Sequence, residues 1–339
     1  MEKRLGYIEV LLRNALNIKK RDSLLISIPS AGKEMALEIE KKAKELGIED
    51  IYIFYNNLSG ARNRIAEYIE KHAKFLLFTT ENKDNLNTQM VNDILNNDLG
   101  IDYTVALFPS DDFITEDELY YYSSITEKDA VVEWNKKISS NNKIVSQIKN
   151  FKLNTLKVES LLDTELTMRL SPEVFGNSYA SKMRLFPNYK VELIPEKNTV
   201  NGYISATGPT MIGNAAIEEL RLAVKNGRVV DYDYISGNEE IRKILDSNFA
   251  PTIEAIGLID KESATYKKYT KFNNIVLDRT SNPYVLISSY DAMNDEKNYL
   301  FVPIGNGSLK VTGCNENGKN IPIYEEEVFS RKIMPIKNK

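Results

Sequence analysis

The sequence predicts an α/β fold in two domains. The N-terminal domain has a doubly wound, mostly parallel sheet, and an α+β domain with much antiparallel sheet follows it. Up to residue 108, short apolar runs alternate with amphipathic helical patterns, as in parallel sheets with helical crossovers. Beyond residue 155, short strand-like segments follow one another across turn residues. Since 339 residues suit about two domains, we place the domains at 1–150 and 155–339.

The first half begins with an amphipathic helix, because apolar residues recur at helical spacing from Ile8 to Leu16. A second helix is expected with Ser30 as its N-cap and Gly47 as its end. These helices and the ones after them alternate with short buried strands. Strands are predicted at 23–28, 51–55, 75–78 and 103–108, and helices at 34–46, near 61–72 and at 86–96.

The second half changes pattern after a Lys-, Asn- and Ser-rich segment at 135–154, which is predicted to be a solvated helix leading into a linker. The pair Asn226-Gly227 separates two short apolar runs, a strong signal for a β-hairpin. Together these features predict antiparallel sheet. Further strand segments are expected at 165–170, 190–194, 202–206, 219–224 and 228–234.

Charge and composition exclude several classes of protein. The 44 basic and 48 acidic residues give a net charge of −4, opposite in sign to that of a general nucleic-acid binder. No run of about 18 apolar residues suggests a membrane span. Met1–Leu5 leads directly into amphipathic sequence instead of a signal peptide's apolar core. The single cysteine, Cys314, excludes an internal disulfide, and we expect a cytoplasmic protein.

Histidine chemistry is restricted to one residue, His72. Zinc hydrolases use two or three imidazole ligands, and serine hydrolases need one correctly placed histidine. His72 continues an apolar helical stripe with Tyr68 and Ile69, so we expect it to be packed rather than catalytic. Cys314 is expected in a turn, without a second histidine to activate it.

Two other motifs have structural explanations. The segment Ile28–Glu34 joins a strand to a helix, but Ser27 and Glu34 stand where a phosphate loop needs glycine and Ser or Thr. We therefore expect helix capping there. The acidic residues of Asp111–Glu118 are expected at a helix start and those of Glu325–Glu327 on a solvated face. An all-oxygen cation site is the alternative for both clusters.

Segments along nearly the whole chain resemble one known family, the M29 class of thermophilic-type aminopeptidases. The resemblance implies the fold of a two-domain metallopeptidase, action on peptide N-termini, and a homodimer formed through the second domain. The segments that carry it are 7–17, 24–26, 34–46, 163–167, 200–204, 226–230 and 237–245.

The resemblance also implies a metal site of two glutamates, two histidines and one aspartate, but the matching positions hold other residues. In Pro187–Val191, Tyr189 and Lys190 replace a pair of glutamates. In Ile253–Leu258, Ala255 stands in place of the second glutamate ligand. The glutamate ligands are therefore absent from the positions that the resemblance assigns to them.

The remaining matches supply no histidine. Residues 271–277 contain none where the third ligand is implied, and Tyr299 stands at the position of the last histidine. Glu254 is adjacent to Ala255, but on a regular strand it would point to the opposite face. A divalent metal ion therefore has no complete ligand set in this sequence.

We accordingly predict no metal, no cofactor and no catalytic residue. Lys190 would repel a divalent cation, and its ammonium group is expected to occupy the cavity and pair with Glu254 or Asp291. The former metal-site region is expected to bind a ligand instead. Its predicted binding residues are Tyr189, Lys190, Glu254, Ala255, Tyr290, Asp291 and Tyr299.

The main hypothesis is a non-catalytic, peptidase-like protein that binds a peptide or small molecule, as an accessory in modified-peptide (natural-product) biosynthesis. One alternative is a metal-independent enzyme with replaced active-site chemistry. In it, Lys190 with Tyr189, Tyr290, Asp291 or Glu254 would form a new acid–base group. Another alternative is a structural subunit of a larger assembly. Nucleic-acid and membrane partners are not expected.

Overall fold

The computed structural model describes residues 2–55, 68, 71–79, 102–110, 114–125, 129–176, 183–186, 190–212, 215–237, 242, 245–246, 250–261, 263, 266, 277, 281–291 and 296–334. The chain divides into two compact units: one comprises 1–138, 178–188 and 274–277, and the other 139–177, 189–273 and 278–339. The sequence suggested a single boundary at 150–155. In the structure the chain passes between the units more than once, and the first passage falls inside helix α6 (Ala130–Asn150).

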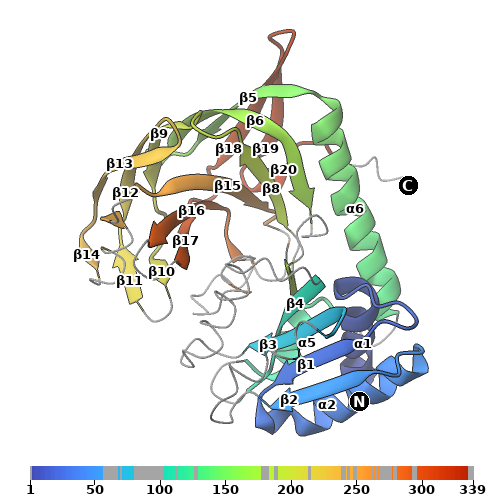
Figure 1. Cartoon of the computed structure of the whole chain (residues 1–339). Coiled ribbons are helices and arrows are strands. Elements are labelled where there is room, and N and C mark those ends of the chain that lie inside the picture. The colour runs from blue at the N-terminus through green and yellow to red at the C-terminus, as the bar shows by residue number, and fades with distance from the viewer. Residues whose placement is uncertain are drawn as a thin grey trace. The chain divides into compact units, whose positions relative to one another are not determined.

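The first unit contains the parallel sheet that the sequence predicts (Figure 1). Its described strands have the order β2-β1-β3-β4-β7, and all neighbours are parallel. β2 and β3 flank β1 on opposite sides, as in doubly wound folds. β7 was not predicted, because it comes from a distant part of the chain. The strands are β1 (Leu24–Ile28), β2 (Ile51–Tyr55), β3 (Lys74–Thr79), β4 (Asp102–Leu107) and β7 (Met183–Phe186).

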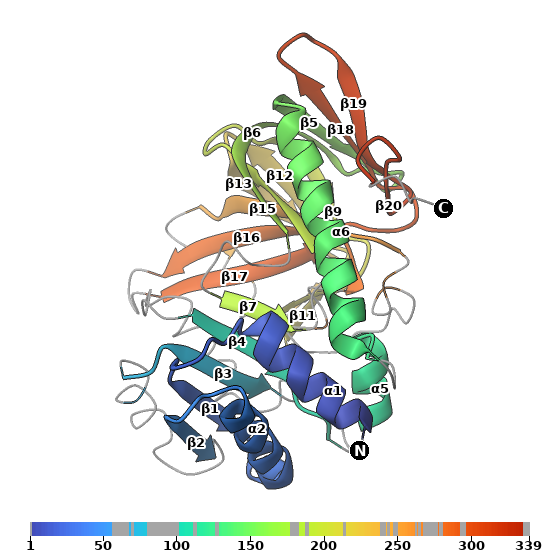
Figure 2. The ribbon, with the colours of Figure 1, turned by 90° about the vertical axis from the view of Figure 1, so that its right-hand side faces the viewer.

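The helices of this unit pack α1 against α2 and α2 against β1 (Figure 2). Among the described helices, none has the length and apolar character needed to cross a membrane. The predicted helices near 61–72 and at 86–96 lie almost entirely outside the described residues. The helical elements are α1 (Glu2–Val10), the π-helical turn η1 (Leu11–Ala15), the 3-10 turn η2 (Ser30–Gly32), α2 (Lys33–Glu45), α5 (Glu116–Tyr122) and the first part of α6.

Tyr7 connects several of these elements in the core. Its side chain is fully buried, and its hydroxyl donates a hydrogen bond of 2.8 Å to the carbonyl oxygen of Leu107. The centroids of the Tyr7 and Phe186 rings lie 5.3 Å apart, and those of the Phe186 and Trp134 rings lie 4.8 Å apart. This packing joins α1, α6 and the strands β4 and β7, and burial raises the pKa of the Tyr7 hydroxyl well above its usual range.

Local chemistry decides where the helices begin. Ser30 is not the N-cap that the sequence predicted, because Pro29 is extended and η2 intervenes before α2. The Gly32 N–H donates to the Pro29 carbonyl oxygen instead. At α5 the predicted acidic helix start is confirmed: Thr115 is the N-cap, and its hydroxyl and the Glu118 side chain form a capping box.

The predicted packing of His72 is confirmed. Its side chain is 7% exposed, and Nδ1 lies 2.7 Å from the carbonyl oxygen of Tyr68. One ring nitrogen of His72 is thus engaged by the backbone of Tyr68.

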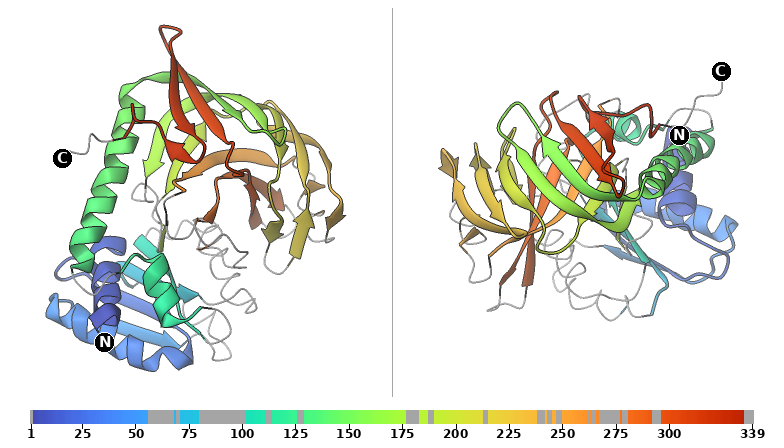
Figure 3. Two further views of the ribbon diagram at one scale, coloured as in Figure 1. Left: turned by 180° about the vertical axis from the view of Figure 1, so that it is seen from behind. Right: turned by 90° about the horizontal axis from the view of Figure 1, so that it is seen from above.

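The second unit contains a curved, largely antiparallel sheet (Figure 3). Within the described residues, the pairing closes a ring of six strands in the order β6-β9-β12-β13-β15-β8. β16, β17, β10, β11 and β14 extend the sheet from β15, and β5, β18, β19 and β20 extend it from β6. The strands are β5 (Leu153–Glu159), β6 (Glu165–Gly176), β8 (Lys190–Pro195), β9 (Asn201–Ser205), β10 (Thr210–Ile212), β11 (Ala215–Glu218), β12 (Arg221–Lys225), β13 (Arg228–Asp233), β14 (Ser236–Gly237), β15 (Thr252–Ile259), β16 (Tyr284–Asp291), β17 (Glu296–Pro303), β18 (Lys310–Asn315), β19 (Asn320–Glu325) and β20 (Val328–Phe329).

The predicted hairpin at Asn226-Gly227 is confirmed. Both residues have positive φ, 51° and 74°, and Lys225 pairs with Arg228 across the turn, as a type I′ turn requires. Cys314 was assigned wrongly to a turn: it lies in β18, where it pairs with Thr155. The segment 237–245, which carries part of the family resemblance, lies mostly outside the described residues, and Gly237 belongs to β14.

Glu327 contradicts the expected solvated face. It is fully buried in the turn between β19 and β20, and its Oε1 accepts hydrogen bonds from the N–H groups of Asn306 (3.1 Å) and Leu309 (3.3 Å). Glu326, its neighbour in the turn, is exposed, and both residues have positive φ. Oε1 of this buried carboxylate thus satisfies two backbone donors, whereas its Oε2 has no hydrogen-bond partner among the described residues.

We expect Glu327→Ala to lower the free energy of unfolding by about 2 kcal/mol, because it leaves two N–H groups without their acceptor. Glu326→Ala is the matched control, since both residues adopt the left-handed conformation and differ in burial. Urea denaturation of both variants measures the difference. Equal stabilities would contradict the role assigned to the Glu327 carboxylate.

Candidate functional site

The candidate site lies on one face of four neighbouring strands, β8, β15, β16 and β17. Their alternate residues, such as Val191, Ile256 and Val285, belong to the main core cluster. The residues between them face the other way and pack around a smaller cluster. We call this second face the site face. Its apolar members are Ile194, Ala255, Ile259, Tyr284, Leu286, Tyr299 and Phe301.

Lys190 is the main charged group of the site face. Its side chain is only 3% exposed, and its Nζ donates to Glu192 Oε1 (2.5 Å) and to the hydroxyl oxygen of Tyr284 (2.8 Å). The Tyr284 hydroxyl donates in turn to the same oxygen of Glu192. An ammonium, a carboxylate and a phenol therefore form a closed hydrogen-bonded triad, in which the buried charges neutralise each other.

Gly257 makes room for this triad. The register places Gly257 of β15 between Glu192 of β8 and Tyr284 of β16. A Cβ atom on Gly257 would lie 2.3 Å from the Tyr284 ring, so the ring rests directly over the glycine backbone. Because Gly257 has no side chain, Tyr284 reaches across β15 to Glu192 and Lys190.

A hydrogen bond from α6 also fixes the backbone at Lys190. The amide of Asn141, which is buried, donates to the Lys190 carbonyl oxygen at 3.0 Å. The start of β8 is therefore held by a helix as well as by its neighbouring strands.

A β-bulge brings Glu254 onto the site face. Thr252 pairs with Ser288 and Ala255 with Leu286, and the register shifts between Ile253 and Ala255. Glu254 is the extra residue. The prediction that it faces away from Ala255 was therefore wrong, because it assumed a regular strand, and a bulge re-aims side chains in this way.

Hydroxyl groups hold the Glu254 carboxylate. Its Oε1 accepts hydrogen bonds from the hydroxyls of Ser288 and Thr252 (3.3 Å to Thr252), and these two hydroxyls lie 3.2 Å apart. All three residues lie on the site face. A second carboxylate is thus positioned there. The predicted pairing of Lys190 with Glu254 or Asp291 stays a prediction.

The structure thus brings together Lys190, Glu254, Ala255 and Tyr299, four of the residues that the sequence proposed. Tyr189 lies outside the described residues, and for Tyr290 and Asp291 only the backbone of β16 is described, paired with Lys297 and Glu296. Whether these seven residues bind a ligand stays a prediction.

Sequence reasoning missed Glu192 and Tyr284. The period of two along a strand puts Glu192 on the same face as Lys190, so the sequence contained that signal. No sequence signal pointed to Tyr284, because its place at the site depends on the pairing of β15 with β16.

The site face does not fit a divalent metal ion. Among the described residues, no three side chains of Asp, Glu, His or Cys are grouped to hold one. The Ala255 side chain has no atom that could bind a metal ion, and the ammonium of Lys190 bonds to the Glu192 carboxylate. Thiolate, imidazole or carboxylate ligands would be needed, so we derive no metal-dependent step.

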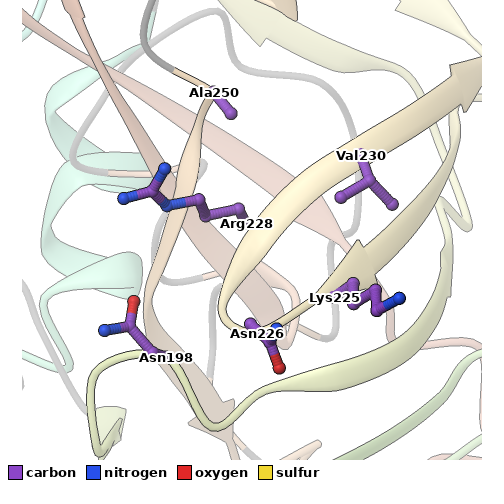
Figure 4. Close-up of a pocket in the computed structure, with 6 residues that line it drawn as sticks. All are labelled: Asn198, Lys225, Asn226, Arg228, Val230 and Ala250. Carbon is purple, nitrogen blue, oxygen red and sulfur yellow. The ribbon is translucent and has the colours of Figure 1, made fainter.

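Two surface hollows lie elsewhere in the second unit. One of about 880 Å³ extends over β5, β6, β18 and β19 and is lined by threonines and paired charges such as Lys157 with Glu159. The other, of about 450 Å³, lies at the β12–β13 turn (Figure 4). There Lys225 and Arg228 extend to opposite sides, so they do not converge on one anion.

Comparison with known proteins relates this fold to peptidases. The family model described as thermophilic metalloprotease (M29) matches residues 114–329. Aminopeptidase AmpS of Bacillus subtilis (strain 168) is 21% identical over 168 residues, and aminopeptidase 2 of Geobacillus stearothermophilus is 24% identical over 166 residues. These matches cover 44% and 42% of the chain, and each spans only 40% of the relative's length.

Solved structures extend the similarity in fold to nearly the whole chain. Wild-type AmpT from Thermus thermophilus superposes with a TM-score of 0.72 at 14% identity, covering 97% of this chain and 99% of that one. The 2,5-dihydroxypyridine dioxygenase from Pseudomonas putida KT2440 superposes with a TM-score of 0.56 at 11% identity, covering 97% and 96%. At these identities the likeness concerns the fold alone.

We expect Lys190→Glu to destabilise the protein by about 3–5 kcal/mol instead of creating a metal site, because it places a second carboxylate beside Glu192. Chemical denaturation with and without added zinc or manganese measures this. Lys157→Glu, at an exposed lysine that also contacts glutamates, is the control for charge reversal. A variant that binds zinc tightly and regains wild-type stability would contradict the expectation.

Proposed function

Since the chain belongs to the M29 family of thermophilic metalloproteases, we propose that it is a peptidase-like protein that has lost catalysis and binds a peptide or small molecule. The observation that carries this proposal is the triad of Lys190, Glu192 and Tyr284 on the site face. A metallopeptidase polarises a carbonyl and activates a water with its metal. An ammonium bonded to a carboxylate and a phenol supplies neither function.

The site face offers binding groups in place of catalytic ones. The half-buried rings of Tyr299 and Phe301 border the small apolar cluster, and the hydroxyl-held carboxylate of Glu254 lies on the same face. Aromatic surface with a polar group beside it is typical of recognition sites. Together with Tyr189, Tyr290 and Asp291, these residues form the proposed ligand site.

A peptide is the ligand that the family relationship favours. The relatives named above are aminopeptidases, and a protein that keeps their fold without their metal suits an accessory role in modified-peptide biosynthesis. We further propose a cytoplasmic homodimer as the working form. The support for both statements is the relationship with the family, an argument by analogy.

A metal-independent enzyme is the second candidate, because a buried lysine beside a phenol and a carboxylate is a possible acid–base group. The burial of both Lys190 and Tyr284 speaks against direct contact between these groups and a substrate. A pH-dependent activity that is lost in Lys190→Ala would favour this second candidate.

We expect peptides encoded beside the gene to bind in isothermal titration calorimetry, and Tyr299→Ala to weaken binding by about tenfold, since tyrosines at interfaces often contribute that much. Tyr203→Ala is the control, because Tyr203 is an exposed tyrosine on β9, outside the site face. Failure of every neighbouring peptide to bind would contradict the peptide-binding proposal.

We also expect the purified protein to contain less than about a tenth of an equivalent of zinc, cobalt or manganese, because the described side chains of the site face include no group of three metal ligands. Chelator should leave the thermal midpoint unchanged, since only a ligand of the folded state raises it. Hydrolysis of leucyl substrates should be absent with or without added metal. A stoichiometric metal ion in the untreated protein would overturn the proposed function.

A further inference from the structure

We infer that Lys190 is an internal cation that takes over the structural work of a metal ion, holding β8 and β16 together across β15. This inference goes beyond the proposed function, because it concerns how the site face is held together and requires no ligand. It starts from the disagreement between the family's description as metalloproteases and the ammonium that this chain places on its site face.

The bonding around Lys190 is that of a small coordination centre. Its Nζ contacts oxygens from two different strands, the carboxylate of Glu192 on β8 and the hydroxyl of Tyr284 on β16. The Tyr284 hydroxyl also donates a hydrogen bond to the Glu192 carboxylate oxygen. A metal ion commonly joins oxygens from separate strands in this way, and here the donor hydrogens of an ammonium do so.

The distance between the strands shows why a side-chain link is needed. β8 and β16 both pair with β15, so they lie two strand spacings apart, about 9.6 Å. No backbone hydrogen bond connects strands at that separation. Tyr284 spans it over Gly257, and Lys190 and Glu192 fix the far end of its ring.

Charge explains why the central group must be a cation. Glu192 is largely buried, with a side-chain exposure of 16%, and an uncompensated carboxylate there would be strongly destabilising. A neutral side chain at position 190 removes the ammonium that bonds to this carboxylate. The ammonium neutralises it permanently, whereas a metal ion would be exchangeable and removable by chelator.

Chemical complementation tests this inference. Lys190→Ala removes the atoms of a propylammonium ion beyond Cβ, so propylammonium is the matched probe and propan-1-ol its neutral counterpart. We expect Lys190→Ala to lower the thermal midpoint by roughly 5–10 °C. Propylammonium should restore part of this loss and propan-1-ol should not. Neither compound should raise the midpoint of the wild type or of Lys157→Ala, the exposed control.

Three results would contradict the role of Lys190 as a required cation. The inference would be overturned if both Lys190→Ala and Lys190→Met kept the wild-type thermal midpoint. It would also be overturned if the amine and the alcohol raised the midpoint of Lys190→Ala equally, since a cation would then not be required. Should neither variant fold, reductive methylation of the folded wild type replaces them. Lys190 should stay unmodified while Lys157 is methylated, and similar rates at both lysines would refute the inference. None of these measurements depends on whether a peptide binds.

Discussion

Charge neutralisation inside a sheet is the constraint on which the site face depends. The Glu192 carboxylate is largely buried on β8, and two of its hydrogen-bond partners are Lys190 of the same strand and Tyr284 of β16. Because a buried ion must be both paired and hydrogen-bonded, the positions of Lys190 and Tyr284 follow from that of Glu192. The ring of Tyr284 must then cross Gly257, which admits no side chain there.

Elements with a clear local period could be predicted from the sequence. β1 to β4 alternate with helical patterns, and Asn226-Gly227 specifies its own turn geometry. β7 could not be predicted, because its position in the parallel sheet depends on a chain segment that returns after β6. The inward turn of Glu327 was missed for a similar reason, since its hydrogen-bond donors at Asn306 and Leu309 come from another loop.

The candidate site shows the same division between local and distant causes. A strand period of two is enough to place Lys190 and Glu192 on one face. The same rule failed at Glu254, because the bulge in β15 becomes visible only through its pairing with β16. Sequence matching thus identified positions that lie on one face, while the contacts between their side chains depend on strand register.

The site face also shows how the two sides of the same strands can serve different purposes. The likeness to AmpT in fold comes with only 14% sequence identity. In this chain Val191, Ile256 and their neighbours pack the core side of the strands. The opposite side of the same strands can change its polar groups as long as charge and hydrogen bonds remain balanced. In the triad, Lys190 and Tyr284 balance the charge and hydrogen bonds of Glu192. At Glu254, the hydroxyls of Ser288 and Thr252 supply hydrogen bonds to the carboxylate.

Because the two described carboxylates of the site face, Glu192 and Glu254, are each held by hydrogen-bond partners, a metal ion would have to displace several interactions at once. A replacement of Lys190 alone would not create a metal site, because Ala255 has no metal-binding atom and Glu254 stays hydrogen-bonded to the Ser288 and Thr252 hydroxyls. The groups that a metal ion would have to replace are therefore distributed over strands β8, β15 and β16, and their hydrogen bonds also link these strands.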